Sequence, residues 1–122
     1  MKKIIALALS IFGSQAAAEQ ELHEASMNFD MENVRPFIEK LNSELGLELN
    51  VNELTKVVSE TPVDSEASVN LEVIYAGKKQ KLIFKAHMDD VDAPDLYIFS
   101  HSQELARSIN SAMMSFAEER DL

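Results

Sequence analysis

The chain has 122 residues, no cysteine and a formal net charge of −10 at pH 7. This length fits one domain, and the lack of cysteine excludes disulfides, a cysteine nucleophile and lipid attachment to a cysteine. An acidic surface disfavours nucleic acid and anionic lipid, both of which attract basic patches. We therefore expect a small domain that is held together by packing and has no nucleic-acid partner.

The N-terminus has the three parts of a secretory signal peptide, in order. Lys2 and Lys3 supply the positive charge, an apolar run follows, and residues 16–18 are three alanines of the kind that signal peptidase accepts. The run is far shorter than the ~20 residues of a membrane-spanning helix. We expect a cleaved signal peptide over residues 1–18 and a mature domain over residues 19–122. That domain would be periplasmic, with the extracellular space as the alternative, and would not insert into a membrane.

The first half of the mature chain predicts helices. Residues 19–30 are polar and weakly periodic, so we expect a flexible arm there. Apolar residues at helical spacing then predict a helix over residues 32–45, which ends at Gly46. A shorter amphipathic segment predicts a second helix over residues 52–58, capped by Asn52.

From residue 69 the apolar period changes from 3.6 residues to 2, which is typical of strands. Two alternating runs, 69–75 and 81–88, flank a short segment that contains a glycine, and this pattern predicts a hairpin. Pairing Tyr75 with Gln80 places the large apolar side chains of both strands on one face.

The C-terminal third completes the predicted fold. An acidic loop over residues 89–94 leads to a third strand over residues 95–100, and a final helix covers residues 102–119. The predicted class is α+β, a two-layer sandwich of a three-stranded antiparallel meander covered on one face by helices. The order is helix, short helix, three strands and helix, in a single domain.

The sequence contains no recognisable catalytic motif. It lacks a Gly-x-Ser-x-Gly sequence, and three glycines cannot form a glycine-rich phosphate loop. Ser100, His101 and Ser102 are adjacent, whereas a catalytic triad requires convergence in space. We therefore expect no enzyme and no cofactor.

Two groups of residues have metal-binding chemistry, although the sequence favours a metal at neither. The first is the carboxylate group Asp89, Asp90, Asp92 and Asp95. It lacks the glycine and glutamate positions of an EF-hand loop, so a solvated connection is the simpler interpretation. The second is the set His23, Met27 and Met31. A helix would align these three as soft Cu(I) ligands, but methionine is also a flexible core filler.

The second face of the predicted sheet is the candidate partner site. If Leu71 and Phe84 point into the core, Ile74 and Ile83 point away from the helices. The third strand adds either Tyr97 and Phe99 or the two residues that alternate with them. An apolar face with a charged rim is typical of a binding surface. The candidate residues are Ile74, Ile83, Lys81, Lys85, Tyr97 and Phe99.

Two functional hypotheses follow. The first is an exported, non-enzymatic interaction domain that binds a protein or peptide, such as an inhibitor, an immunity-type protein or an assembly accessory protein. The alternative is a small periplasmic carrier of a metal or ligand. The competing structural interpretation of the candidate face is that residues 47–58 or the N-terminal arm cover it.

The signal-peptide hypothesis predicts the first residue of the native protein. Mass spectrometry of the chain from its own host should find Glu19 at the N-terminus, because cleavage after Ala18 follows the small-residue pattern. A cytosolic species that begins at Met1 would contradict export.

Overall fold

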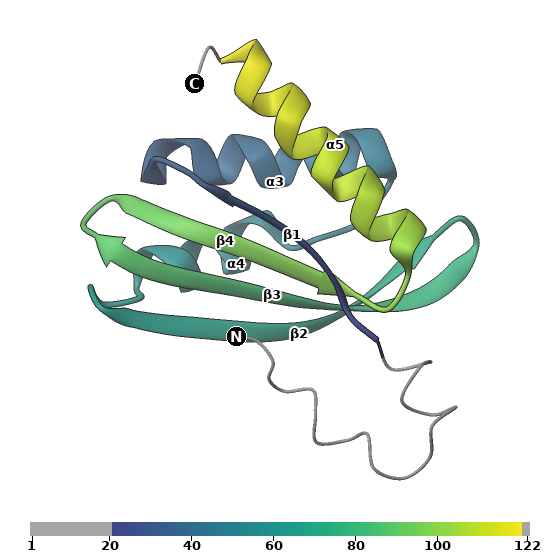
Figure 1. Ribbon diagram of the computed structural model, residues 1–122, viewed down its shortest axis with the longest axis horizontal. Coiled ribbons are helices and arrows are strands. Elements are labelled where there is room, and N and C mark those ends of the chain that lie inside the picture. The colour runs from purple at the N-terminus through teal and green to yellow at the C-terminus, as the bar shows by residue number, and fades with distance from the viewer. Residues whose placement is uncertain (1–20, 121–122) are drawn as a thin grey trace, which may run out of the picture.

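The computed structural model describes residues 21–120, so the expected signal peptide over residues 1–18 lies outside the described part. The elements, in chain order, are β1 (His23–Asn28), α3 (Met31–Leu45), α4 (Val51–Ser59), β2 (Ser65–Tyr75), β3 (Lys78–Asp90), β4 (Ala93–Ser100) and α5 (Gln103–Glu119). The strands form one antiparallel sheet in the order β1-β4-β3-β2. Helices α3 and α5 lie across one side of this sheet (Figure 1).

The α+β class is confirmed, but the sheet has four strands where the sequence predicted three. The additional strand, β1, lies within the segment expected to be a flexible arm. It pairs with β4 so that Ala25 lies opposite Ile98, and both are buried. Because the buried side chain is a small alanine between polar neighbours, the segment has little hydrophobic alternation. Backbone pairing with β4 gives it the order that its side chains do not indicate.

The predicted hairpin is present, with its register shifted by two residues. Tyr75 pairs with Lys78 across the two-residue turn Ala76–Gly77, where the sequence had suggested Gln80 as the partner. Both turn residues have positive φ, 54° and 77°, as a tight turn matched to strand twist requires. A shift of two leaves every side chain on its predicted face, because the period of a strand is also two.

The acidic loop expected at residues 89–94 is mostly strand. Strand β3 continues to Asp90 and β4 begins at Ala93, so the connection is the turn Val91–Asp92. Asp92 has a φ of 65°, and its carbonyl accepts a hydrogen bond from the Met31 amide at 2.8 Å. The turn is thus fixed to the start of α3.

The helix boundaries follow from local capping. Gly46, in the left-handed conformation, ends α3. Asn50 rather than Asn52 caps α4, because its side-chain oxygen accepts a bond from the Glu53 amide. Ser102 caps α5 in the same way through the Leu105 amide.

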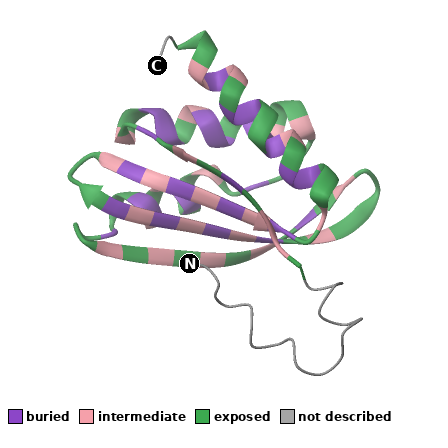
Figure 2. Ribbon diagram, viewed as in Figure 1, coloured by how far each residue is buried: buried purple, intermediate pink, exposed green. Residues whose placement is uncertain are grey.

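Every second residue is buried from Leu82 to Met88 on β3 and from Pro94 to Ser100 on β4 (Figure 2). At the centre of the core three rings meet. The Phe29 centroid lies 4.8 Å from that of Phe37 and 5.9 Å from that of Phe116, and the last two are 5.6 Å apart. These rings join the end of β1 to α3 and α5. The buried side chains of α4, Leu54 and Val58, belong to the same core.

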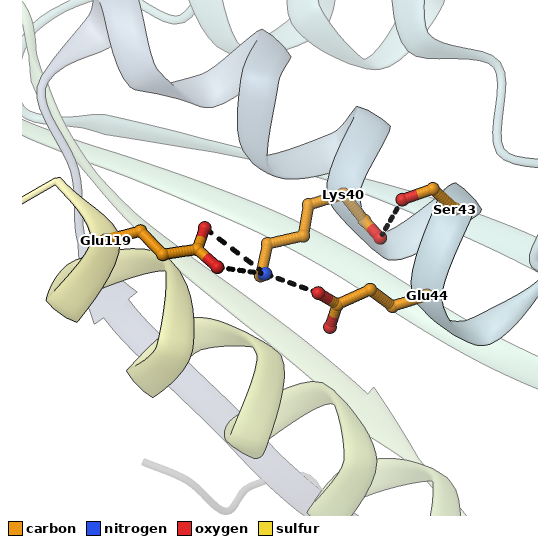
Figure 3. Close-up of polar contacts among 4 residues, drawn as sticks. All are labelled: Lys40, Ser43, Glu44 and Glu119. Atoms are coloured by element: carbon orange, nitrogen blue, oxygen red, sulfur yellow. Dashed lines mark hydrogen bonds and ion pairs between the residues drawn. The ribbon is translucent and has the colours of Figure 1, made fainter.

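An ion-pair network at the margin of this core also joins α3 to α5. The Lys40 ammonium donates to the Glu44 and Glu119 carboxylates (Figure 3). The bond to Glu44 is the largest influence that raises the pKa of Lys40, and burial partly opposes it. The network therefore stabilises the fold through neutral pH. Its contribution is lost as the pH rises through the raised pKa of Lys40.

The fold predicts a large energetic difference between the two sheet faces. Phe84→Ala should lower the free energy of unfolding by about 3 to 5 kcal/mol, the usual cost of removing a buried ring, because Phe84 is 1% exposed. The matched control Ile74→Ala, at a side chain that is 61% exposed, should change it by less than about 0.5 kcal/mol. Urea unfolding measures both. A loss below about 1 kcal/mol for Phe84→Ala, with a larger loss for Ile74→Ala, would mean that the faces are assigned the wrong way round.

Candidate functional site

The sheet face that points away from the helices is called the outer face below. Its residues on β3 and β4 are half-buried, whereas their neighbours on the other face are buried (Figure 2). The strand register arranges the outer face in rows. Phe99 lies opposite Ile83, Tyr97 opposite Lys85, and Asp95 opposite His87. The inner residues of the same strands belong to the core with the helices. These three cross-strand pairs are therefore the part of β3 and β4 that lies at the surface.

An aromatic pair is central to the outer face. The rings of Tyr97 and Phe99 are stacked with centroids 6.4 Å apart and planes at 5°. The Lys85 ammonium lies 5.9 Å from the Tyr97 centroid, within the range of a cation–π contact. The sequence had left two orientations of β4 open, and the structure directs Leu96 and Ile98 inward and the two aromatic residues outward.

A hollow of about 420 Å³ adjoins the aromatic pair. It extends from Phe99 and Ile83 to Leu22, which precedes β1, and its polar lining includes Lys81 and His101. The volume is sufficient for a side chain or a short peptide segment, and it lies in the lower part of the range of ligand pockets, roughly 300 to 1,000 Å³. Glu72 also lines the hollow and lies opposite Lys81, so the hollow has apolar walls and a rim with one charge of each sign.

Charges on the outer face alternate in sign between neighbouring strands. Lys85 lies 3.4 Å from the Glu66 carboxylate on β2, and Lys81 is paired in register with Glu72. All four residues lie on the surface and are at least partly exposed, so each pair contributes little to stability. They are therefore available to change partners when another charged surface docks.

Tyr97 has a perturbed phenol. Burial raises its pKa above the ordinary tyrosine value, and the nearby carboxylates, first Asp95 and then Glu24, raise it further. A raised pKa keeps the phenol protonated through neutral and mildly alkaline pH. Tyr97 therefore presents a neutral hydroxyl, which both donates and accepts hydrogen bonds.

The structure brings together two of the four aspartates proposed as metal ligands, and adds a histidine. Ligand atoms of His87, Asp89 and Asp95 lie within 4.8 Å of one another at one end of the outer face. The Asn28 amide donates to Asp95 at 2.8 Å and fixes its carboxylate. An imidazole with two carboxylates is a donor set suited to zinc, after a small inward movement.

The other residues proposed as metal ligands are dispersed. Asp90 ends β3 and Asp92 occupies the turn, and neither belongs to the cluster with His87. His23 and Met27 lie on strand β1, and Met31 starts α3, so no single helix aligns the three. At about 3.3 Å per residue along a strand, the Cα atoms of His23 and Met27 are roughly 13 Å apart. That separation does not suit two ligands of one ion.

The predicted outer-face residues fall into two groups. Ile83, Lys85, Tyr97 and Phe99 form one continuous area with Lys81 at its margin. Ile74 is also exposed on this face, but it pairs with Lys79 near the hairpin turn, away from the aromatic pair.

Sequence reasoning missed Leu22, Glu66 and Asn28 as members of the outer face or of its hollow. The period of two did place His87 on the same side as Ile83 and Lys85. Asn28 and Glu66 required strands that the sequence pattern did not show.

None of the three helices in residues 21–120 has the length and apolar character to cross a membrane. Comparisons with protein-family models, curated proteins and solved structures found no significant match to this chain.

The cluster of His87, Asp89 and Asp95 predicts a metal preference that can be measured. Zn²⁺ should bind more tightly than Ca²⁺, because one imidazole nitrogen and two carboxylates suit zinc, whereas calcium needs six to eight oxygen ligands. Calorimetric titration of the whole protein measures both ions. His87→Ala should remove zinc binding, and His101→Ala, at an exposed histidine outside the cluster, should leave it intact. Zinc binding that survives His87→Ala would exclude this site.

Proposed function

We propose that the protein is an exported, non-enzymatic interaction domain that binds a protein or peptide partner through the outer face of its sheet. The observation that carries this proposal is the stacked pair Tyr97–Phe99 beside the hollow at Ile83. Large rings left half-exposed beside an apolar hollow lose contact with water when a partner docks. Aromatic side chains in such positions contribute much of the binding energy of protein interfaces.

The chemistry of the outer face defines the partner. An apolar or aromatic side chain fits the hollow between Phe99, Ile83 and Leu22. A carboxylate next to that side chain would compete with Glu72 for Lys81 at the rim and with Glu66 for Lys85 beside Tyr97. Charge of this kind orients the partner and accelerates association more than it adds affinity. The proposed ligand is therefore an acidic segment with one apolar anchor residue.

The compartment and the absence of catalysis are supported by the sequence. The order of Lys2-Lys3, apolar run and alanine triplet favours export to the periplasm, with secretion as the alternative. The lack of a nucleophile motif or phosphate loop favours a binding role. Inhibitors, immunity-type proteins and assembly accessory proteins all fit this description.

The alternative function, a small periplasmic metal carrier, gains one specific observation. His87 joins Asp89 and Asp95 in a cluster with ligand chemistry. The cluster is partly exposed and offers three side chains, which fits a weak, exchangeable ion better than a permanent one. The metal content of protein taken from its native compartment distinguishes a carrier from an interaction domain.

The interaction hypothesis predicts that Ile83→Asp removes partner binding without unfolding the domain. A photo-crosslinking residue in place of Tyr97 should yield one discrete adduct in the native host, and adding Ile83→Asp should abolish that adduct. The melting temperature should fall only slightly, because Ile83 is half-buried on the outer face and does not belong to the core between the sheet and the helices. The same crosslinker in place of Met114, exposed on α5, is the matched control and should yield no such adduct.

Two results would contradict the proposal. Unfolding of the Ile83→Asp variant would show that the chain itself covers the outer face. Identical adducts from the Tyr97 and Met114 positions would show that capture does not depend on that face.

A further inference from the structure

The two edges of the sheet differ in how they are protected. At one edge β1 has six residues, and α5 packs against it. At the other edge β2 has 11 residues and pairs with β3 along its whole length without a bulge. Natural edge strands avoid further pairing by being short, by bulges, or by carrying proline and charged side chains, above all lysine. Strand β2 has no bulge, proline or lysine, and its charged residues are Glu66 and Glu72.

The hairpin geometry determines which backbone groups of β2 are unpaired within residues 21–120. Tyr75 and Lys78 flank a two-residue turn, so they form a hydrogen-bonded pair. In an antiparallel pair of strands, hydrogen-bonded residue pairs alternate with non-hydrogen-bonded pairs. In the second kind, the amide and carbonyl groups point away from the partner strand. The outer-face residues of β2 therefore direct their amide and carbonyl groups to the free edge. They are Glu66, Ser68, Asn70, Glu72 and Ile74.

The inner face at β2 is also incompletely covered. Ala67, Val69 and Leu71 point toward the helix side, yet all three are only half-buried. Helix α5 packs mainly against β1 and β4, and it meets β2 at the end of that strand, where the Tyr75 hydroxyl lies 2.9 Å from the Ser108 hydroxyl. The earlier part of β2 lies at the margin of the sheet, away from α5 (Figure 1). A further strand beside β2 would satisfy the free backbone groups and cover these three apolar side chains together.

We infer that this added strand is β2 of a second copy of the chain, paired antiparallel about a two-fold axis at Asn70. Asn70 is the middle residue of Ser65–Tyr75, so this register pairs the two strands over their full length. Neither glutamate then faces a glutamate, since Glu66 lies opposite Ile74 of the second copy and Glu72 opposite its Ser68. On the inner side Val69 meets Leu71 of the second copy, and their half-exposed surfaces bury each other.

The resulting assembly is closed. Each copy uses the same edge, so the interface is isologous and pairing stops at a dimer with one eight-stranded sheet. The net charge of −10 on each copy opposes association, so the dimer should tighten as salt screens the repulsion. This inference does not depend on the proposed function, although it would place two outer faces side by side.

Sedimentation equilibrium of the full-length protein tests the inference, with concentrations up to about 1 mM, the weak end of specific association. The wild type should be a monomer–dimer mixture that shifts toward dimer at higher salt. Asn70→Pro should be monomeric, because it removes an edge donor and leaves the ladder to β3 unbroken. A wild type that stays monomeric across this range overturns the inference.

Substitutions at Ser68 test the register itself. Ser68→Lys places a lysine opposite Glu72 of the second copy, twice per dimer, and should lower the dissociation constant by about 2- to 30-fold, whereas Ser68→Glu should raise it similarly. Within one copy Ser68 lies opposite Lys85, so the same two changes should move the melting temperature of the monomer in the reverse order. The register is supported if Ser68→Lys strengthens the dimer and lowers the melting temperature of the monomer, while Ser68→Glu does the reverse. A dimer whose affinity ignores both substitutions uses another surface and overturns the inference.

Discussion

The contact among Phe29, Phe37 and Phe116 determines where the other elements lie. These rings come from the residue after β1, from α3 and from the last turn of α5, so one cluster joins the N-terminal and C-terminal parts of the described chain. Burial of three rings supplies more stabilisation than the exposed ion pairs around them. With β1 held beneath α5, its backbone is in position to pair with β4. The fourth strand thus depends on the aromatic cluster as much as on its own sequence.

All the buried apolar side chains lie on one side of the sheet, and this one-sidedness explains both surfaces proposed for binding. Helix α5 packs mainly against β1 and β4, and the half-buried inner residues of β2 show that coverage decreases toward that edge. The outer face therefore retains half-exposed Tyr97 and Phe99, while the far edge retains an unpaired strand with half-exposed Val69. A domain of this size has too few helices to cover more of its sheet. The fold therefore leaves the outer face and the β2 edge uncovered, and the apolar side chains on both are of the kind found in protein interfaces.

The sequence predicted the elements that are defined by a pattern of apolar side chains. It did not predict the elements that are defined by backbone hydrogen bonds or by unusual backbone conformations. The alternation through Phe84 and Ala86 was visible because large apolar residues repeat every second position. Strand β1 was missed because Ala25 is small, and the end of β3 was missed because aspartates are uncommon in strands. The hairpin register was two residues off because Ala76 adopts a positive φ that alanine rarely takes. The aromatic pair was found from sequence, whereas the His87 cluster needed the tight turn between β3 and β4, where the sequence predicted a loop over residues 89–94.

The position of β1 also has a consequence for the order of folding. Strands β2, β3 and β4 are joined by two-residue turns and can pair as soon as they are synthesised, but His23 pairs with Ser100 at the far end of the chain. Closing such a long loop is entropically costly, so β1 should dock last. Until Ser100 and α5 are available, the aromatic cluster is incomplete and no stable core exists. For a chain that must cross a membrane unfolded, as the proposed export requires, late closure keeps the nascent protein competent for transport.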